Sequence, residues 1–598
     1  MWLKLFAYLH RFLFDFAVKW LRSHVDERTY LIVVSVTIGA VAGLAAVLLK
    51  QFVRLIKFLL DGWFEPAEFN ILYLVYPMAG IALAVLYVKR IHGGKMDKGL
   101  SRLLLALSRN SARLPRSATY SHMVSSALTV SFGGSAGLEA PIVLTGSAIG
   151  SNVAKELRAQ PRFRNLFIAC GAAAGISAVF NSPIAGVIFA LEVLLPELTV
   201  ASFIPLLMAS ATATIISKLL FYETIFATVL REWQMGALPF YIVLGLLCGC
   251  VAAYMTRTTF RLEARFKKIK LNARGRVIFG GLALGILIFL FPPLFGEGYE
   301  TINDLFRRHY PALLNNSLFY EFKHSPWALV AFATAMIFIK VIATALTIGA
   351  GGNGGIFAPS LFTGALTGFV LSRSINLLTG WGLNEVNFVA IGMAGVISGV
   401  VHAPLTGIFL IAEITGGYAL IVPLMIVSSL AFFVARYIEP YSVYTKPLAE
   451  ENKVHVASPD DVLLQRIETR ALIEAAFASA PYEGTLRDLL HTIKQSKRNI
   501  FPVVDRDGKF RGIVLLDDIR DQIFDPSTYD NIRIAKLMQI PADTVVPGES
   551  APRIMEKFEK HGVWRLPVVE GDRFVGFISK SRLLNAYREV LVGRQEGV

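Results

Sequence analysis

Long apolar runs without charged residues fill most of the sequence between about Leu31 and Tyr437. Of the 598 residues, 54% are hydrophobic and 17% are charged, whereas about 25% of the residues of a soluble globular domain are charged. Runs of this kind are typical of helices that cross a lipid bilayer. The sequence therefore predicts a polytopic α-helical membrane protein and excludes an ordinary soluble or disordered chain.

Several of these apolar segments are shorter than the ~20 residues that a helix needs to cross a bilayer. The segments span approximately 30–49, 70–88, 118–132, 141–155, 165–195, 200–221, 239–255, 276–295, 327–349, 355–374, 386–416 and 418–437. Short segments that contain Gly and Pro indicate broken helices, which are tolerated in a membrane only where their free backbone groups face a polar cavity. We therefore expect helix ends to meet inside the membrane.

Two blocks in the first half of the chain recur in the second half. GGSAGLEAP, which starts at Gly133, matches GGNGGIFAP, which starts at Gly351, 218 residues later. GAAAGISAVFNSPIAGVIFALE, which starts at Gly171, matches GMAGVISGVVHAPLTGIFLIAE, which starts at Gly392. Duplicated halves with interrupted segments are typical of transporters whose site lies between the repeats near the middle of the bilayer. In this class of transporter the two halves are often inverted, and we expect the same here.

The glycine-rich blocks are predicted to form the starts of helices. The first backbone N–H groups of a helix lack partners, and the helix dipole adds positive potential there, so an anion is the expected ligand. Helix ends from both repeats could replace the hydration shell of the anion without a fixed cation, which would hold the ion too tightly. Glycines in membrane helices also serve close packing, and this alternative stays open for each block.

Glu139 stands where the second block has Phe357. An ionisable residue at membrane depth is costly and indicates a functional role. At an anion-attracting helix end its carboxylate could act as a tethered anion, which blocks the site when ionised and frees it when protonated or displaced. The alternative is a carboxylate that caps the start of a helix.

Glu192 and Glu413 end the second pair of blocks at equivalent positions. Two carboxylates could serve an intramembrane enzyme. Their symmetric placement instead favours a shared structural role, such as a contact with a helix end or with backbone amides.

Two tyrosines, Tyr441 and Tyr444, lie at the end of the membrane part. A phenol can donate one hydrogen bond to an anion without adding a permanent charge. Tyrosines in this place are also typical of the interfacial belt of a membrane protein.

A second, smaller repetition follows the membrane part. Residues 486–524 and 551–586 each contain a helical run, two short strands rich in β-branched residues and another helix. The strand FPVV at Phe501 matches LPVV at Leu566, and GIV at Gly512 matches GFI at Gly576. This pattern predicts a pair of small α/β modules.

Together these motifs resemble those of the CLC family of chloride channels and chloride/proton exchangers, followed by two CBS domains. GLEAP at 137–141 is similar to the family's G-x-E-x-P motif, and GIFAP at 355–359 is similar to its G-x-F-x-P motif. The resemblance implies a polytopic α-helical membrane protein with a CLC-type inverted repeat and broken helices, plus a cytosolic α/β CBS pair. It also implies that Glu139 is the gate and that the protein is a homodimer with one pore per subunit. The anion-binding residues that it implies are Gly137, Gly355, Ile356, Phe357, Ala358 and Tyr444.

Two departures from the family pattern bear on mechanism. The family's G-S-G-I-P stretch supplies a serine ligand, but the region from Asp97 to Arg102 reads DKGLSR, so no serine ligand is assigned to Ser101. Exchangers usually carry an inner proton glutamate directly after the residue that Glu192 resembles, whereas this chain has Val193, as in the family's channels. We therefore favour a passive, voltage- or pH-gated chloride channel. The alternatives are a chloride/proton antiporter with a different proton route and, disfavoured by the chloride-type motifs, a fluoride-specific protein.

The CBS modules carry parts of a nucleotide-binding pattern. Adenosine-ligand sites in CBS domains often use G-x-[IV]-[ST]-x-x-D. The first module has Asp518 but Leu515 at the hydroxyl position, and the second has Ser579 but Arg582 at the acidic position. An adenine nucleotide that contacts Asp518 and Ser579 is therefore one candidate cofactor, and a regulatory domain without ligand is the alternative. No metal site is expected.

Charge patterning indicates the orientation and the partners. The net charge is +15, but Lys and Arg gather in short loops such as 257–276, a bias of cytoplasmic loops and not of nucleic-acid binding. We expect an integral protein of the cell (inner) membrane with its N-terminus and CBS domains in the cytoplasm, and chloride, lipid and a second copy as partners. The rival class is a CBS-regulated membrane receptor or enzyme, but no nucleophile–base pair or metal-spaced ligand set appears in the apolar segments, so no enzymatic activity is expected.

The expected domains follow from these boundaries. They are an N-terminal amphipathic helix (1–28), membrane repeat 1 (29–235), membrane repeat 2 (236–446), a linker (447–472), CBS module 1 (473–530) and CBS module 2 (531–598).

Overall fold

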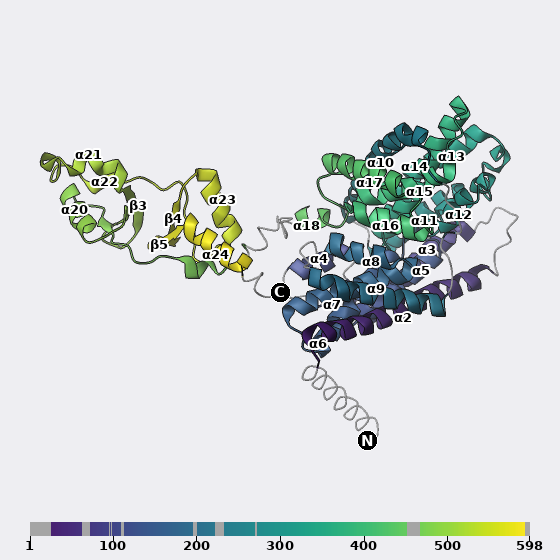
Figure 1. Cartoon of the computed structure of the whole chain (residues 1–598), viewed down its shortest axis with the longest axis horizontal. Coiled ribbons are helices and arrows are strands. Elements are labelled where there is room, and N and C mark those ends of the chain that lie inside the picture. The colour runs from purple at the N-terminus through teal and green to yellow at the C-terminus, as the bar shows by residue number, and fades with distance from the viewer. Residues whose placement is uncertain are drawn as a thin grey trace, which may run out of the picture. The chain divides into compact units, whose positions relative to one another are not determined.

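The computed structural model describes residues 25–61, 72–94, 99–108, 113–194, 200–221, 232–268, 272–450 and 467–592, together with residues 96, 226 and 464. The chain divides into two compact units, Met1–His455 and Val456–Val598 (Figure 1). Residues 1–24 of the expected N-terminal helix and residues 451–463 of the expected linker lie outside the described residues. Asp97 and Lys98 also lie outside them.

The first unit is built of helices joined by short connections in the residues that the structure describes. The first repeat contributes α2 (Glu27–Asp61), α3 (Leu72–Ile91), α4 (Leu100–Ser108), α5 (Ala118–Ser131), α6 (Glu139–Glu156), α7 (Pro161–Phe180), α8 (Pro183–Phe189), a π-helical turn (Ala190–Leu194) and α9 (Val200–Leu220). The second repeat contributes α10 (Leu238–Lys268), α11 (Ala273–Leu290), α12 (Tyr299–Phe306), α13 (Pro326–Gly349), α14 (Phe357–Thr379), α15 (Glu385–Val401), α16 (Pro404–Ile414), α17 (Ile421–Ile438) and α18 (Lys446–Glu450). Nine helices in the described residues are long and apolar enough to cross a membrane, which confirms the polytopic prediction.

The predicted apolar segments 165–195 and 386–416 are each broken into two helices. Asn181 (φ 56°) and His402 (φ 59°) adopt the left-handed conformation at the two breaks. In both repeats a proline two residues later begins the next helix, because proline fits the first helical turn but not a helix interior. The halves therefore break at the same place, and α8 and α16 are too short to cross a bilayer alone.

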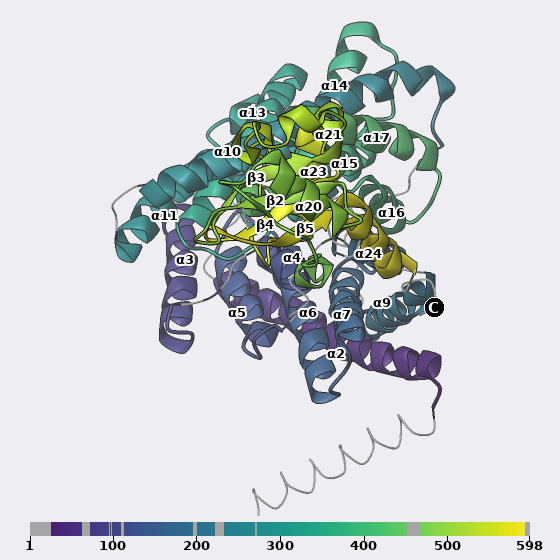
Figure 2. The same ribbon diagram turned by 90° about the vertical axis from the view of Figure 1, so that its left-hand side faces the viewer.

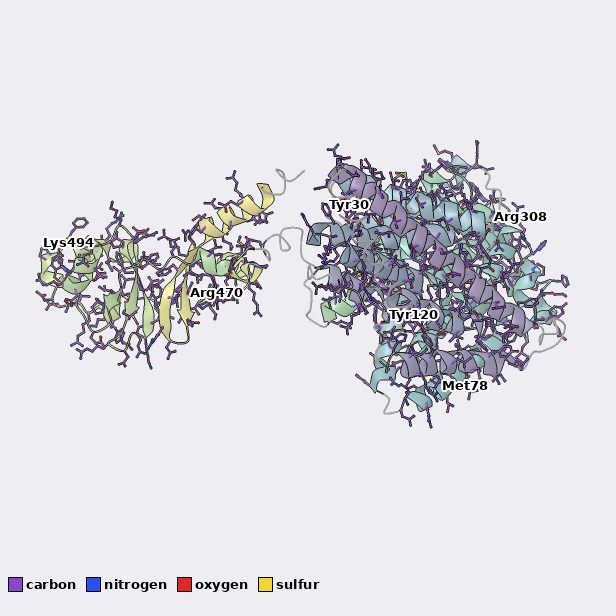
Figure 3. The ribbon with its side chains drawn as sticks, turned by 90° about the horizontal axis from the view of Figure 1, so that it is seen from below. Tyr30, Met78, Tyr120, Arg308, Arg470 and Lys494 are labelled. Carbon is purple, nitrogen blue, oxygen red and sulfur yellow. The ribbon has the colours of Figure 1, made fainter. Side chains whose placement is uncertain are left out.

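The two halves repeat the same helix contacts. α6 packs against α7 as α14 packs against α15, and α2 packs against α9 as α10 packs against α17. Figure 2 shows α2 crossing the first repeat, where it contacts α5, α6, α7 and α9. Figure 3 shows α2, which carries Tyr30 near its start, running obliquely along the unit. The inverted-repeat fold thus rests on equivalent pairs of packed helices.

Close packing explains the glycines that follow the two glycine-rich blocks. A Cβ at Gly146 would lie 2.0 Å from the carbonyl oxygen of Gly171, and a Cβ at Gly364 would lie 2.4 Å from that of Gly392. Glycine lets the backbones of neighbouring helices approach this closely. These two glycines, which lie inside α6 and α14, therefore serve close helix packing.

The second unit contains two α/β modules, as predicted. The first has β1 (Ala480–Pro481), α20 (Leu486–Lys494), β2 (Ile500–Val504), β3 (Phe510–Leu515) and α21 (Arg520–Ile523), with the strand order β1-β2-β3. α22 (Ile534–Leu537) follows the boundary expected at 531, but its Ile534 packs in the core of the first module. The second has α23 (Ala551–His561), β4 (Arg565–Glu570), β5 (Arg573–Ser579) and α24 (Lys580–Val592), with β4 paired to β5. Both hairpins have a register irregularity at the same place, after Val503 and after Val568. Each module has its own buried core.

Candidate anion site

The starts of α6 and α14 meet through the two glycine-rich blocks. The N–H of Gly137 donates to the carbonyl of Gly355 at 2.8 Å, and the N–H of Gly355 donates to the carbonyl of Gly137 at 2.7 Å. The two segments run antiparallel, as equivalent parts of inverted repeats do. These two amides pair with each other and join the helix starts, so the expected anion-binding role of Gly137 and Gly355 cannot use their N–H groups.

Each block is also held by a threonine of the opposite repeat. The hydroxyl oxygen of Thr129 on α5 accepts from the N–H of Asn353 at 3.0 Å, and that of Thr347 on α13 accepts from the N–H of Ser135 at 3.1 Å. A buried backbone N–H without a partner is costly. The reciprocal contacts therefore fix the loop that precedes each helix start.

The start of α14 presents backbone amides that have no acceptor within the helix. Ile356 precedes the helix, and Phe357 and Ala358 form its first turn. Amides in these positions lack acceptors within the helix, and the helix dipole makes this end positive. Phe357 is buried, and its ring centroid lies 5.5 Å from that of Phe180. The amides of Ile356, Phe357 and Ala358 are therefore the donors that an anion could use.

Glu139 is the first residue of α6 and is only 1% exposed. Its Oε1 accepts a hydrogen bond from the hydroxyl of Tyr299, whereas Oε2 has no hydrogen-bond partner among the described residues. The carboxylate interacts with the backbone of Ala358. A Cβ on Gly137 would lie 2.0 Å from Oε2 and 2.9 Å from the Cβ of Ala358. The carboxylate thus lies over Gly137, beside the start of the helix of the other repeat.

The two tyrosines near the end of the unit differ in burial. Tyr441 is 41% exposed, whereas Tyr444 is 7% exposed and interacts electrostatically with Glu139. The N–H of Val443 donates to the carbonyl of Val400 at 3.1 Å, which ties this segment to the end of α15. Only Tyr444 is therefore brought to the site, and Tyr441 fits an interfacial belt.

Glu192 and Glu413 each bind the start of a short helix in the opposite repeat. Glu192 accepts a hydrogen bond from the N–H of Thr406 on α16 at 2.8 Å, and Glu413 accepts one from the N–H of Ala185 on α8 at 2.9 Å. Carboxylates stabilise helix starts because they satisfy free amides and oppose the dipole. The predicted shared structural role is confirmed. Next to Glu192, Val193 packs against the apolar core.

Three residues near Glu139 were missed by the sequence reasoning. Tyr299 begins α12, and Glu297 lies two residues before it and interacts electrostatically with Glu139. Lys340 on α13 is fully buried and interacts with Glu297. The repeat offset could have drawn attention to Lys340, because it falls 218 residues after His122, which is also buried. Lys340 donates to the carbonyls of Leu294 and Gly296, and the expectation that helix ends hold the anion without a fixed cation stays a prediction.

The two candidate nucleotide contacts have different partners. Asp518 accepts a hydrogen bond from the side chain of Gln539 at 2.7 Å. Ser579 donates to the carboxylate of Glu474 at 3.3 Å, and this carboxylate also pairs with Arg498 at 2.9 Å. The hydroxyl of Ser579 is therefore engaged by a carboxylate that is itself paired with an arginine.

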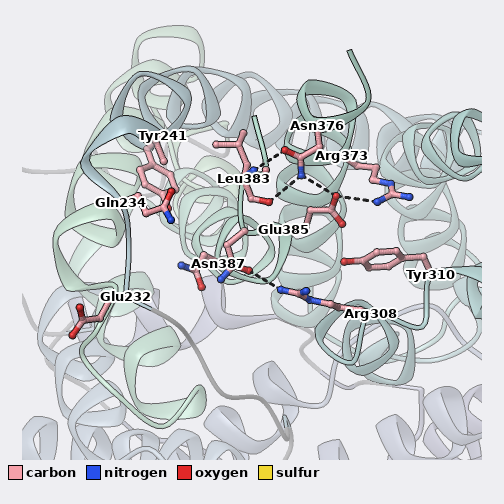
Figure 4. A pocket seen from close by; sticks show the side chains of 13 residues that line it. Glu232, Gln234, Tyr241, Arg308, Tyr310, Arg373, Asn376, Leu383, Glu385 and Asn387 are labelled. Carbon is pink, nitrogen blue, oxygen red and sulfur yellow. Dashed lines mark hydrogen bonds and ion pairs between the residues drawn. The ribbon is translucent and has the colours of Figure 1, made fainter. Parts of the chain in front are cut away.

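A polar cavity of about 410 Å³ is lined mainly by residues of the second repeat, none of which belongs to the anion site (Figure 4). Glu385 is central to it, with Arg373 at 3.2 Å and the amide of Asn376 at 3.1 Å. The hydroxyl of Tyr310 also interacts with this carboxylate. Across the described residues, no group of three or more His, Cys, Asp or Glu side chains is arranged to hold a metal ion.

Comparisons with known proteins agree with this geometry. Residues 79–436 match the family "Voltage gated chloride channel", and residues 471–525 and 534–589 each match the CBS domain. A putative chloride channel protein, ClcB-like, from Ralstonia nicotianae is 31% identical over 385 residues, which are 63% of this chain and 85% of that protein.

Two solved structures share the fold. A slow cyanobacterial Cl⁻/H⁺ antiporter has a TM-score of 0.59 and 23% identity, over 72% of this chain and all of the other. A CLC-type fluoride/proton antiporter has a TM-score of 0.56 and 26% identity, over 70% of this chain and 97% of the other. The predicted fold class is confirmed. The chain therefore belongs to the family of voltage-gated chloride channels, whose members are channels and transporters and not enzymes, and it carries a C-terminal pair of CBS domains.

Proposed function

We propose that the protein conducts chloride passively across the membrane and that Glu139 gates the path. The observation that carries this proposal is the position of the Glu139 carboxylate, which is buried beside the amides at the start of α14. A carboxylate there competes with a permeant anion for the same positive helix end. Ile356, Phe357 and Ala358 would donate backbone hydrogen bonds to the anion, and Tyr444 would donate one from its hydroxyl.

Passive conduction is favoured over exchange by the residues at and beside position 193, where exchangers usually carry a proton glutamate. Val193 has a hydrocarbon side chain and cannot carry a proton. Its neighbour Glu192 accepts hydrogen bonds from Leu405 and Thr406 and is engaged at the start of α16. Chloride/proton exchange by a different proton route is the second candidate, because both solved neighbours named above are antiporters.

The decisive experiment uses purified protein in liposomes. Liposomes loaded with chloride should release it when a potassium ionophore balances the charge, and protein-free liposomes should not. A chloride gradient imposed across the membrane should then drive no uphill proton movement, as followed with a pH-sensitive dye. Proton pumping in proportion to the chloride flux would reject the channel and establish the second candidate.

The same assay tests which anion the protein prefers. We expect chloride to be released faster than fluoride at equal gradients, because both helix-start motifs follow the chloride-type pattern. Faster release of fluoride would reject chloride as the main permeant ion.

We also propose a homodimer in the cell membrane, with the CBS pair in the cytoplasm acting as a regulatory domain. Basic residues at the end of α6, at the end of α10 and at the start of α11 support this orientation, because Lys and Arg favour the cytoplasmic side of a membrane. A membrane-impermeant thiol reagent should label a cysteine introduced at Asp507 only after the cells are opened. Labelling of intact cells would contradict the orientation. Light scattering of the purified protein should give the mass of two chains.

A further inference from the structure

The hydrogen bond that Tyr299 makes to Glu139 comes from a segment that the family motifs do not include. The segment Phe291–Tyr299, here called the latch segment, connects α11 to α12 and begins with a short 3₁₀ turn (Pro292–Leu294). It ends where the hydroxyl of Tyr299 donates to Oε1 of Glu139, across 160 residues of sequence. The latch segment therefore belongs to the second repeat but contacts the start of α6 in the first.

Lys340 anchors the middle of the latch segment. Its ammonium group donates to the carbonyl of Leu294 at 3.2 Å and to the carbonyl of Gly296 at 2.9 Å, and the lysine is fully buried. The same ammonium lies 4.8 Å from the centre of the Phe362 ring on α14. A buried cation is tolerated only when carbonyls, a carboxylate or an aromatic face stabilise it. Here these partners fix the latch segment to α13.

Close backbone contacts hold the latch segment at Gly296 and at Gly298. The N–H of Gly296 points to the carbonyl of Gly133 at 3.4 Å. Gly298 (φ 91°) lies so near α14 that a Cβ on it would be 2.4 Å from the Phe362 ring. A residue with a side chain would be strained at this φ and would collide with the ring.

The ring of Tyr299 is held as firmly as the segment that carries it. Phe226 packs against it edge-on, with ring centroids 5.7 Å apart. Glu297, two residues earlier, interacts with the backbone of Leu138, which directly precedes Glu139. The hydroxyl of Tyr299 is thereby directed at one oxygen of the gate, while the other oxygen lies beside the start of α14.

We propose that Tyr299 is a positioning residue that latches Glu139 in the anion path, with Lys340 as the anchor of the latch segment. The proposal rests on the proposed gating role of Glu139 and adds the group that keeps the gate closed. Tyr299 touches the gate through one hydrogen bond, so its removal shifts the balance between the closed and the open position of the carboxylate. A hydrogen bond to a charged group is strong enough to shift such a balance about tenfold.

The test is chloride release from liposomes by four variants at neutral pH. Tyr299→Phe removes only the hydroxyl and should raise the release rate about tenfold, in line with the loss of one charge-assisted hydrogen bond. Tyr310→Phe is the matched control, because the hydroxyl of Tyr310 also interacts with a carboxylate, that of Glu385, but in the polar cavity of Figure 4. It should leave the rate unchanged. Glu139→Gln and the double variant Glu139→Gln/Tyr299→Phe should release chloride at the same rate.

The outcomes separate the latch from the gate. If Glu139→Gln raises the rate but Tyr299→Phe behaves like the wild type, the positioning role of Tyr299 is wrong and the gating role of Glu139 is supported. If Tyr299→Phe still raises the rate when Glu139 is already Gln, the tyrosine acts elsewhere and the latch is again wrong. If Glu139→Gln itself changes nothing, the proposed gating role fails, and the latch fails with it.

The anchor is tested by Lys340→Met, which removes the ammonium, and by Lys340→Arg, which retains donors for the two carbonyls. Lys340→Met should raise the rate in the wild-type background but not together with Tyr299→Phe, and Lys340→Arg should stay closer to the wild type. A wild-type rate in Lys340→Met would overturn the role of Lys340 as anchor. Should Lys340→Met fail to fold, Lys340→Arg and Tyr299→Phe still decide the proposal.

Discussion

The two repeats of the membrane unit make the same backbone contacts at the starts of α6 and α14 but carry different side chains there. Gly137 and Gly355 pair with each other, and Thr129 and Thr347 each bind a backbone N–H of the opposite block. At the first residue of the helix, however, one repeat has the acid Glu139 and the other has the apolar Phe357. The symmetric contacts build the site, and the asymmetric side chains decide what each helix start can do.

The helices that precede α6 and α14, which are α5 and α13, also differ in the side chains at equivalent positions. His122 on α5 and Lys340 on α13 occupy equivalent positions, and both are buried. Lys340 binds the carbonyls of the latch segment, which has Tyr299 at its end. The second repeat therefore supplies the groups that hold the acid of the first.

The largest expected effect comes from removing the asymmetry at the helix starts. Glu139→Gln should raise chloride release at neutral pH more than tenfold, because a gate that is open in fewer than about 10% of molecules would no longer close. Wild-type release should increase as the pH falls, since protonation removes the charge of the carboxylate, and the variant should lose this increase. Chloride-selective electrodes outside liposomes at pH 7.5 and pH 5 measure both.

Phe357→Leu is the matched change at the other helix start. It should retain the acid dependence of the wild type, because Phe357 carries no charge. If Glu139→Gln keeps both the rate and the acid dependence of the wild type, the difference between the repeats has no part in gating.

The second prediction compares the paired glycines. A Cβ on Gly137 would lie 2.9 Å from that of Ala358, and a Cβ on Gly355 would lie 2.9 Å from that of Ala140. Gly137→Ala and Gly355→Ala should therefore each lower the stability of the protein by about 1–3 kcal/mol, the cost of overpacking. Only Gly137→Ala also collides with the carboxylate of Glu139, so it alone should raise chloride release severalfold.

Thermal unfolding in detergent and chloride release from liposomes measure the two effects. Equal rates for the two glycine variants would mean that the carboxylate of Glu139 does not lie over Gly137 in the closed protein.

The smallest expected effect concerns the carboxylates that bind the short helices. Glu192→Gln and Glu413→Gln should each cost about 1 kcal/mol, because an amide is a weaker partner for a helix start than a carboxylate. The loss should be larger for Glu192, which also accepts a hydrogen bond from the hydroxyl of Thr406 at 2.8 Å. Unfolding temperatures of the two variants in detergent test the order. A larger loss for Glu413 would contradict it.

Much of the fold could be read from periodicity and repetition. The apolar segments predicted the long helices, and the matched blocks predicted both the duplication and the convergence of the helix starts. Apolar patterning predicts the ends of helices less well. It gives one continuous segment for 165–195 and one for 386–416, although each contains two helices. Apolar composition continues across the breaks at Asn181 and His402, so hydropathy alone does not reveal them. The breaks depend on the left-handed conformation of these two residues.

The site itself was only partly predictable. The motifs identified Glu139 and the amides that follow Gly355. They did not reveal that the amides of Gly137 and Gly355 donate to each other's carbonyls. Sequence shows which residues are equivalent but not which of their groups face each other. Tyr299 and Lys340 were missed for a related reason, since neither belongs to a repeated block.

The sequence by itself determined that this protein is a duplicated bundle of broken membrane helices, with an acid at one helix start and a phenylalanine at the other. It could do so because local composition and repetition are properties of the chain. Only the tertiary structure decided which groups surround that acid. The hydroxyl of Tyr299 and the ammonium of Lys340 reach their places through contacts between residues 160 and 46 positions apart, and such contacts arise from packing, which no local pattern records.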